Sequence, residues 1–275
     1  MISIEETTFD MAELPEVVYK YRNWNNLEYK RILTHNEIFF AHPLDCQEQH
    51  ECNLQYDYDS LTERMIYDYG YMIAPQFGCF ADNERRKFAN HLVKNSPIYC
   101  KGFQIRHEEN LRRDLDSYIS IFCVSEHRDN YNLWSTFAKG QTGFCIGINT
   151  RKMYSKANNF GGSGKVQYFP LDEMPKIRPF YFSHAEILED FTKTVFSLPD
   201  IYKEEDEYRL IKLDSGERRI NIREECFEEI ILGELISKAN KEEIVKISKG
   251  RFPHSKLFQA KYDYEFEYYI FNEIK

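Results

Sequence analysis

Two short apolar segments near the middle of the chain constrain its fold most. Residues 118–124 read Tyr-Ile-Ser-Ile-Phe-Cys-Val, and residues 143–148 read Gly-Phe-Cys-Ile-Gly-Ile. Uncharged runs of this length, rich in β-branched and aromatic residues, are typical of buried strands. They therefore predict the centre of a β-sheet that other elements cover.

The remaining pattern mixes strands with helices. Further strands are predicted at residues 17–21, 38–41, 165–169, 202–210, 229–233 and 256–270, and helices at 60–70, 82–95, 104–116, 183–197 and 241–249. The three helices after the second strand predict a helical insertion at about residues 60–116. Because no long linker or repeat divides the sequence, we expect residues 1–275 to form one α+β domain with a mixed or antiparallel central sheet.

Composition disfavours some classes of protein, such as disordered, nucleic-acid-binding, secreted and membrane-anchored proteins. Of the 275 residues, 42% are hydrophobic and 16% aromatic, which favours a packed core over disorder. The net charge of −9 disfavours general affinity for nucleic acid, because phosphate groups need a basic surface. Residues 1–10 are polar and acidic, unlike a signal peptide, and no apolar run approaches the ~18 residues of a membrane span. Together with seven cysteines, an odd number, this predicts a cytoplasmic protein without a membrane anchor.

An acidic segment at residues 202–210 is the first candidate for chemistry. Read as a strand, it places Lys203, Glu205, Glu207 and Arg209 on one face. One interpretation is a solvated edge strand with weak ion pairs. The other is a polar cleft in which a carboxylate faces a developing positive charge and an arginine binds an anionic substrate group.

Two further groups of residues are candidates for binding. In the first, Ser125 follows a buried strand, and Trp134 and Ser135 lie in the next short helix. They would form an aromatic wall and hydroxyl contacts in a ligand pocket, or simply a core tryptophan beside a helix cap. The second group alternates along a strand: Tyr19 and Tyr21 share one face, and Lys20 and Arg22 share the other. It would bind phosphate and stack on a base, or be an ordinary surface strand.

Two other motifs carry less weight. His42, Cys46, His50 and Cys52 are all possible zinc ligands, but their spacing matches none of the regular zinc sites, so a polar loop without metal is expected. Residues 161–165, Gly-Gly-Ser-Gly-Lys, lack the first glycine and the hydroxyl residue of a phosphate-binding loop and predict a flexible turn.

The three candidate groups occur in an order that resembles a known family. The motifs are Tyr-Lys-Tyr-Arg at 19–22, Ile-Phe-Phe at 38–40 with Asp-Cys at 45–46, Leu-Trp-Ser-Thr-Phe at 133–137, and Glu-x-Glu-x-Arg at 205–209. Over about residues 17–235 the chain resembles a widespread bacterial family of unknown function (DUF2971-like). It departs from that pattern at His42, where the family has an Asn-Asp-Pro loop, and at Phe137, where tyrosine is common.

A second, more distant resemblance suggests an activity. The three-part layout is similar to that of ADP-ribosyltransferases, including the DNA-targeting bacterial toxins of the DarT type. This resemblance implies an NAD-consuming transferase or glycohydrolase. Glu207 would stabilise the oxocarbenium-like ribose, and Glu205 would orient or deprotonate the acceptor. The groups that would contact NAD are Tyr19, Lys20, Tyr21, Arg22, Ser125, Trp134, Ser135 and Arg209.

Two alternatives stay open. The chain is either the NAD-consuming enzyme, acting on a protein or nucleic-acid acceptor, or a binding or sensing module without catalysis. Either would suit a toxin or phage-defence system, with an antitoxin or defence protein as partner. A third hypothesis is a nuclease with a divalent ion near Glu205, Asp206 and Glu207, although alternating strand faces argue against a shared ion.

Overall fold

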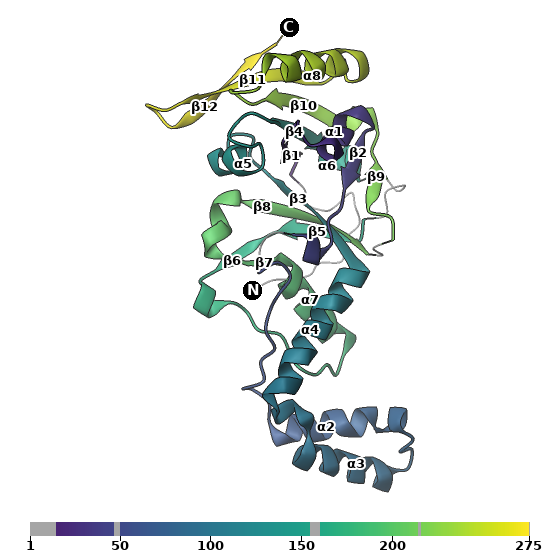
Figure 1. Ribbon diagram of the computed structural model, residues 1–275. Helices are drawn as coiled ribbons and strands as arrows, with labels where there is room; N and C mark the ends of the chain where they lie inside the picture. The colour runs from purple at the N-terminus through teal and green to yellow at the C-terminus, as the bar shows by residue number, and fades with distance from the viewer. Residues whose placement is uncertain (1–14, 47–49, 155–159, 214–215, 275) are drawn as a thin grey trace.

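The computed structural model describes residues 15–46, 50–154, 160–213 and 216–274, and its centre is a mixed β-sheet. The strands of this sheet are β1 (Val17–Arg22), β3 (Ile119–Ser125), β4 (Phe144–Asn149), β5 (Gly162–Lys165), β8 (Glu207–Leu213), β10 (Phe227–Leu232), β11 (Lys256–Asp263) and β12 (Tyr268–Glu273). They lie in the order β12-β11-β10-β4-β1-β3-β8-β5 (Figure 1). β10 and β11 are parallel, and the other neighbours are antiparallel. The predicted α+β class with a mixed central sheet is therefore confirmed.

Two short ribbons and a set of helices surround the sheet. The ribbons pair β2 (Glu37–Phe39) with β9 (Arg219–Asn221), and β6 (Gln167–Phe169) with β7 (Ser197–Pro199). The α-helices are α1 (Leu27–Thr34), α2 (Glu63–Ile73), α3 (Asp82–Asn95), α4 (Lys101–Tyr118), α5 (Tyr131–Thr136), α6 (Thr150–Met153), α7 (His184–Phe196) and α8 (Lys238–Arg251). None of the helices in the described segments is both long enough and apolar enough to cross a membrane.

The sheet is buried on both faces where the two apolar segments predicted it. Both segments form interior strands, since β4 lies between β10 and β1, and β3 between β1 and β8. On one face, residues such as Phe122 and Ile146 pack with Leu33 of α1 and Ile244 of α8. On the other face, separate clusters form beneath α5 and beneath α7. Side chains that alternate along each strand supply these two layers of core.

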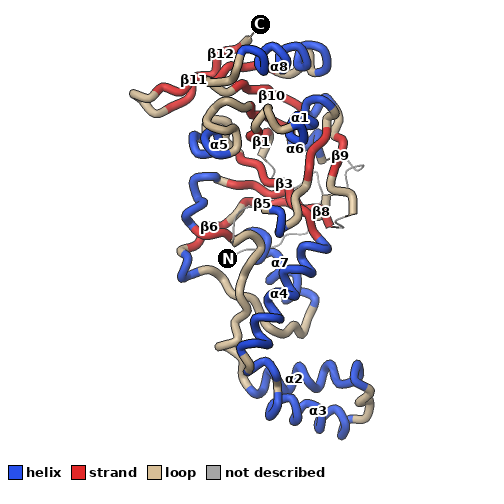
Figure 2. Tube along the Cα trace, in the orientation of Figure 1, coloured by secondary structure: helices blue, strands red, loops and turns tan. Residues whose placement is uncertain are grey.

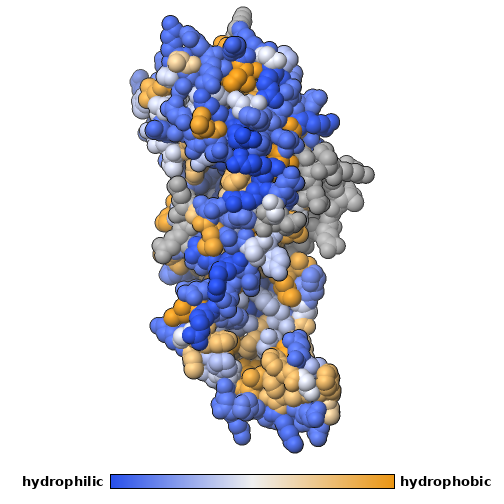
Figure 3. Space-filling model, turned by 45° about the vertical axis from the view of Figure 1, so that its right-hand side comes forward, coloured by the Kyte–Doolittle hydropathy of each residue, from blue (hydrophilic) through white to orange (hydrophobic). Residues whose placement is uncertain are grey.

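The predicted helical insertion is present as three helices, two of which project away from the sheet. α4 leads from β3 to a hairpin of α2 and α3 at the end of the molecule farthest from α8 and β12 (Figures 1 and 2). A Cβ at Gly70 would lie 3.1 Å from the Ala89 Cα, so glycine permits the close approach of the two helices. Figure 3 shows apolar atoms gathered over this hairpin, where Phe77 and Phe80 are exposed.

Three local predictions are wrong. The segment predicted as one strand at 256–270 is a hairpin in which β11 pairs antiparallel with β12. The segment predicted as a strand at 202–210 begins instead as a 3₁₀ helix, η6 (Asp200–Glu205), and the strand starts only at Glu207. Asp206 joins them with left-handed backbone angles (φ 43°, ψ 58°), which aspartate tolerates better than most residues. The segment predicted as a flexible turn at 161–165 contains β5, which pairs with β8. Its glycines leave room for neighbours, since a Cβ at Gly164 would lie 3.1 Å from the Phe196 ring.

Candidate ligand-binding cleft

A cleft opens where two neighbouring strands separate. β1 and β3, both fully described, pair at the single register position Tyr19↔Ser125. Farther along β3, Ala41 takes the place of β1 by exchanging backbone hydrogen bonds of 2.8 and 2.9 Å with Ile121. The chain after β2 thus lies between the two strands and holds them apart. Their facing edges then border a hollow rather than a continuous ladder.

This cleft has a volume of about 430 Å³ and brings together residues from all three motif regions. A volume of this size is typical of small-molecule sites. Seven of the predicted site residues line the cleft: Tyr19, Lys20, Tyr21, Arg22, Ser125, Glu205 and Glu207. The remaining three, Trp134, Ser135 and Arg209, are not part of its lining.

One side of the cleft carries two cations of β1. The Lys20 ammonium donates a hydrogen bond to the carbonyl of Cys123, the backbone group that a continued β1–β3 ladder would set opposite Tyr21. The Arg22 guanidinium lies 4.6 Å from the centre of the Tyr29 ring and donates to the Tyr21 carbonyl at 3.4 Å. Among the described residues, neither cation has a carboxylate oxygen within 4.0 Å. Two cations that lack a direct carboxylate contact favour an anionic ligand.

Burial weakens the charged forms of both side chains. It lowers the pKa of Lys20 from 10.5 to about 8, and the neighbouring charge of Arg22 lowers it further in the same direction. Burial also lowers the pKa of Arg22, which nevertheless stays charged at neutral pH. Glu207 favours the charged form of Lys20 only from beyond 4.0 Å, so a ligand phosphate would supply the direct anionic contact that neither cation has among the described residues.

The opposite side of the cleft carries carboxylates. Glu207 is the first residue of β8, is 6% exposed and lies opposite Ser125 in the β3–β8 ladder. Both of its carboxylate oxygens accept hydrogen bonds of 3.0 Å from Arg209. Arg209 is fully buried and also binds Glu51, at 2.8 Å. Arg209 thus holds both carboxylates at this side of the cleft, and Glu207 and Glu51 both line it.

Arg209 therefore has a different position from the one predicted. We expected it or Arg22 to bind an anionic group of the ligand, but the exposure of Arg209 is 0% and its donors bind Glu51, Glu207 and the Val195 carbonyl. The two carboxylates raise the pKa of Arg209 well above its usual value, against the effect of burial. Its geometry is that of a residue that positions Glu207.

Of the two interpretations of Trp134 and Ser135, the structure supports a core tryptophan beside a helix cap and not a wall of the ligand pocket. Trp134 is 0% exposed and packs edge-on against Tyr21 at 5.2 Å, while its indole nitrogen donates to the Arg128 carbonyl at 2.9 Å. It is a core residue and not a wall of the cleft. Ser135 is exposed on α5, whereas the next two residues, Thr136 and Phe137, line the cleft.

Tyr19, Tyr21 and Ser125 reach the cleft but also have partners in the protein. The Tyr19 hydroxyl donates to Glu229 at 3.2 Å, and burial followed by that carboxylate raises its pKa. The Tyr21 hydroxyl donates to the His127 carbonyl at 2.5 Å. Ser125 Oγ accepts the backbone N–H of His127 at 3.2 Å, which leaves the hydroxyl proton to another acceptor.

The turn at Asp206 sets the direction of both glutamates. Glu205 ends η6 and Glu207 begins β8, so they reach the cleft from different elements and not from one strand face. Asp206 binds His127 at 2.6 Å and Lys165 at 2.9 Å. Although burial acts in the opposite direction, the contacts with Lys165 and then His127 lower the pKa of Asp206. The ion pair with Lys165 and the hydrogen bond with His127 hold the left-handed residue in place.

Replacing Asp206 tests this turn. We expect Asp206→Ala to lower the free energy of unfolding by about 1–2 kcal/mol, because alanine loses both contacts and tolerates the backbone poorly. Asp206→Gly loses the same contacts but suits φ 43°, so its loss should be smaller. Urea denaturation of the two variants separates the contribution of the side-chain contacts from the cost of the backbone conformation. Equal losses would show that the backbone conformation costs nothing.

The possible zinc ligands are dispersed. His42 contacts the Ile119 carbonyl at 3.2 Å, Cys46 lines the cleft, and Cys52 is buried beside Glu51. No group of three or more histidine, cysteine, aspartate or glutamate residues suited to a metal ion occurs within the described segments. The acids of the nuclease hypothesis do not form such a group either. Glu207 binds Arg209, and Asp206 binds Lys165 and His127.

Several lining residues were missed. Glu51 lies in a loop with no recognisable pattern, and only the fold brings it to Arg209. Phe39 was placed in a predicted strand without a functional role, and Tyr29 was given no role, although both line the cleft. One signal in the sequence could have indicated Tyr29. Asn26 caps α1, which places Tyr29 in the first turn of that helix, close in sequence to Lys20 and Arg22 of β1.

Comparison with known proteins gives no independent assignment. No protein-family model, no curated protein and no solved structure matches this chain.

Proposed function

We propose that the cleft binds NAD and that the protein cleaves the bond between nicotinamide and ribose. The observation that supports this most is the division of charge across one cleft. Lys20 and Arg22 of β1 have no carboxylate oxygen within 4.0 Å among the described residues, and Glu207 of β8 lines the same cleft. A dinucleotide with an anionic pyrophosphate and a ribose that becomes cationic during reaction complements both sides.

The chemistry would follow from that placement. The nicotinamide nitrogen leaves with the electron pair of the glycosidic bond, and the ribose carbon gains oxocarbenium character. Glu207 stabilises this charge, and Arg209 holds its carboxylate in one orientation through two hydrogen bonds of 3.0 Å. An acceptor then attacks the ribose carbon and loses its proton to Glu205, which lines the same cleft. Water, a protein or a nucleic acid would each serve as acceptor.

The decisive experiment measures nicotinamide release from NAD. We expect the purified full-length protein to release nicotinamide, and Glu207→Gln to lower the rate about tenfold or more, because glutamine keeps the shape but removes the negative charge. Leu44→Ala, at an exposed position of the neighbouring segment, serves as a control that should leave the rate unchanged. Equal background rates in wild type and Glu207→Gln would reject the mechanism.

A second candidate is a module that binds the same ligand without cleaving it. The bidentate Glu207–Arg209 pair favours this alternative, because such a pair is also a common structural device. In that case NAD would raise the melting temperature of the protein without nicotinamide being released. The same sample, assayed for both quantities, distinguishes the two functions.

A further inference from the structure

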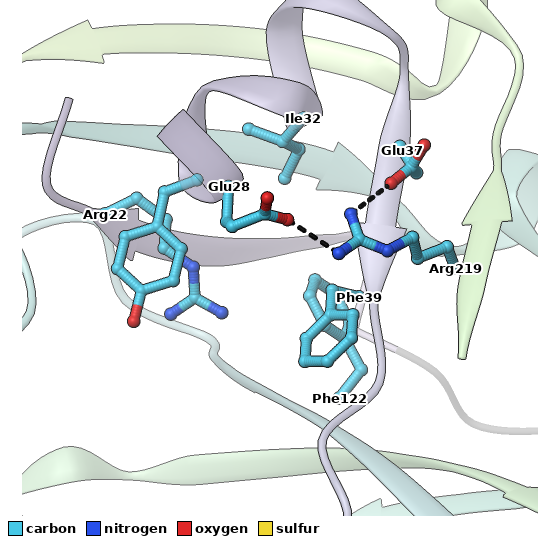
Figure 4. A pocket seen from close by; sticks show the side chains of 8 residues that line it. Arg22, Glu28, Ile32, Glu37, Phe39, Phe122 and Arg219 are labelled. Carbon is cyan, nitrogen blue, oxygen red and sulfur yellow. Dashed lines mark hydrogen bonds and ion pairs between the residues drawn. The ribbon is translucent and has the colours of Figure 1, made fainter. Parts of the chain in front are cut away.

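A small side pocket adjoins the cleft beside Arg22 (Figure 4). Its volume is about 160 Å³. Arg22, Tyr29 and Phe39 line both the side pocket and the cleft, so the two hollows meet at these residues. A ligand that occupies the cleft at Arg22 can therefore extend into the side pocket.

The walls of the side pocket suit a planar aromatic ring system, and its volume holds at least one ring of it. Ile32 and Phe122, which are 5% and 2% exposed, supply an apolar surface, and Phe39 supplies an aromatic one. A cavity of about 150 Å³ lined by apolar side chains is known to bind benzene. The open side toward the cleft gives room for the atoms that join such a ring to the rest of a ligand.

The charges around the side pocket favour a neutral ring over a cationic one. Arg219 binds Glu28 at 2.6 Å and Glu37 at 2.9 Å, and both contacts are drawn in Figure 4. Contacts with Arg31 and Arg219 lower the pKa of Glu37 to about 2, so its carboxylate is committed to these cations. Arg22, in contrast, has no carboxylate within 4.0 Å among the described residues. The nearest unbalanced charge is therefore positive.

We infer that the side pocket binds the neutral planar base of a nucleotide whose phosphates contact Lys20 and Arg22. Adenine has this chemistry, and the oxidised nicotinamide ring, which is cationic, does not. This inference rests on the proposed function only in taking the base to be the adenine of NAD. Binding of the base itself requires no cleavage.

Calorimetry with the full-length protein tests the inference. We expect ADP to bind about tenfold or more tightly than inorganic pyrophosphate, and AMP more tightly than ribose 5-phosphate by a similar factor, because a stacked base adds affinity. Phe39→Ala should remove most of this advantage and lower pyrophosphate affinity far less than ADP affinity. Phe80→Ala, on the distant hairpin and 75% exposed, should change neither.

The possible outcomes are separable. Equal affinity of ADP and pyrophosphate for the wild-type protein would overturn the inference, and so would a failure of both to bind. That comparison needs no variant and holds even if Phe39→Ala does not fold. If ADP binds through Phe39 but NAD is not cleaved, the base site stands and the proposed chemistry fails. If NAD is cleaved while Phe39→Ala leaves the preference for ADP intact, the base site fails and the proposed chemistry stands.

Discussion

Replacing Arg209 with methionine is expected to lower the free energy of unfolding by about 3–5 kcal/mol, because it removes the guanidinium that binds the buried carboxylates of Glu207 and Glu51. Arg209 is 0% exposed, and the Glu207 and Glu51 side chains beside it are 8% and 4% exposed. Urea or thermal denaturation of the purified variant measures the loss. Nicotinamide release should fall as well, since Glu207 loses the contact that orients it.

Arg219 provides a matched control for this substitution. It also joins two glutamates, Glu28 and Glu37, but its side chain is 43% exposed. We expect Arg219→Met to cost less than about 1 kcal/mol, as exposed ion pairs do. A similar small loss for Arg209→Met would mean that water reaches the buried cluster. In that case Arg209 would not position Glu207.

A variant that lacks all three charged side chains separates the effect of an unpaired charge from the effect of packing. Replacing Arg209, Glu207 and Glu51 together with apolar residues of similar size should recover most of the stability, because no buried charge is then left alone. The same variant should not release nicotinamide. Recovered stability with lost activity would show that the cluster serves function more than folding.

Much of the fold could be predicted because strong local patterns agree with it. The apolar runs of β3 and β4 require burial whatever surrounds them, and both became interior strands. The helices at 82–95 and 104–116 have polar surfaces and strong helix formers, and α3 and α4 lie there. In these segments local propensity and tertiary packing favour the same structure.

The candidate site was harder to predict because it depends on contacts across the chain. The alternation of charge at 202–210 is real in part, since Glu207 and Arg209 do share a strand face. The pattern could not show that Asp206 breaks the strand, because the contacts that hold its left-handed backbone come from His127 and Lys165. Likewise, the glycines at 162 and 164 predict a turn locally, but pairing with β8 makes them a strand. Tertiary contacts outweighed local propensity at both points.

Replacing Lys20 with methionine is the second large effect we expect, and it acts in two directions. The partly buried Lys20 ammonium has one hydrogen bond, to the Cys123 carbonyl, and no carboxylate oxygen within 4.0 Å among the described residues. Loss of the hydrogen bond should lower the free energy of unfolding by about 1 kcal/mol. Removal of the desolvated charge should raise it by more, so we expect a net increase of about 1–2 kcal/mol. Affinity for pyrophosphate should fall at least about tenfold, because a cation that faces the ligand is gone. A residue that costs stability and provides binding is typical of a functional site.

The pH dependence identifies the same group. Lys20 has a pKa of about 8 in the folded protein and 10.5 as its ordinary value. Between these values the unfolded chain binds a proton that the folded protein has released, so the stability contributed by this group rises with pH. Pyrophosphate affinity must fall through the same range, because Lys20 loses its charge.

Burial raises the pKa of Cys123 well above its usual value, so this neighbouring thiol does not ionise there. Titrating stability and affinity from about pH 7 to about pH 10 should give opposite slopes in wild type and neither slope in Lys20→Met. Identical profiles for the two proteins would exclude Lys20 as the anion-binding group.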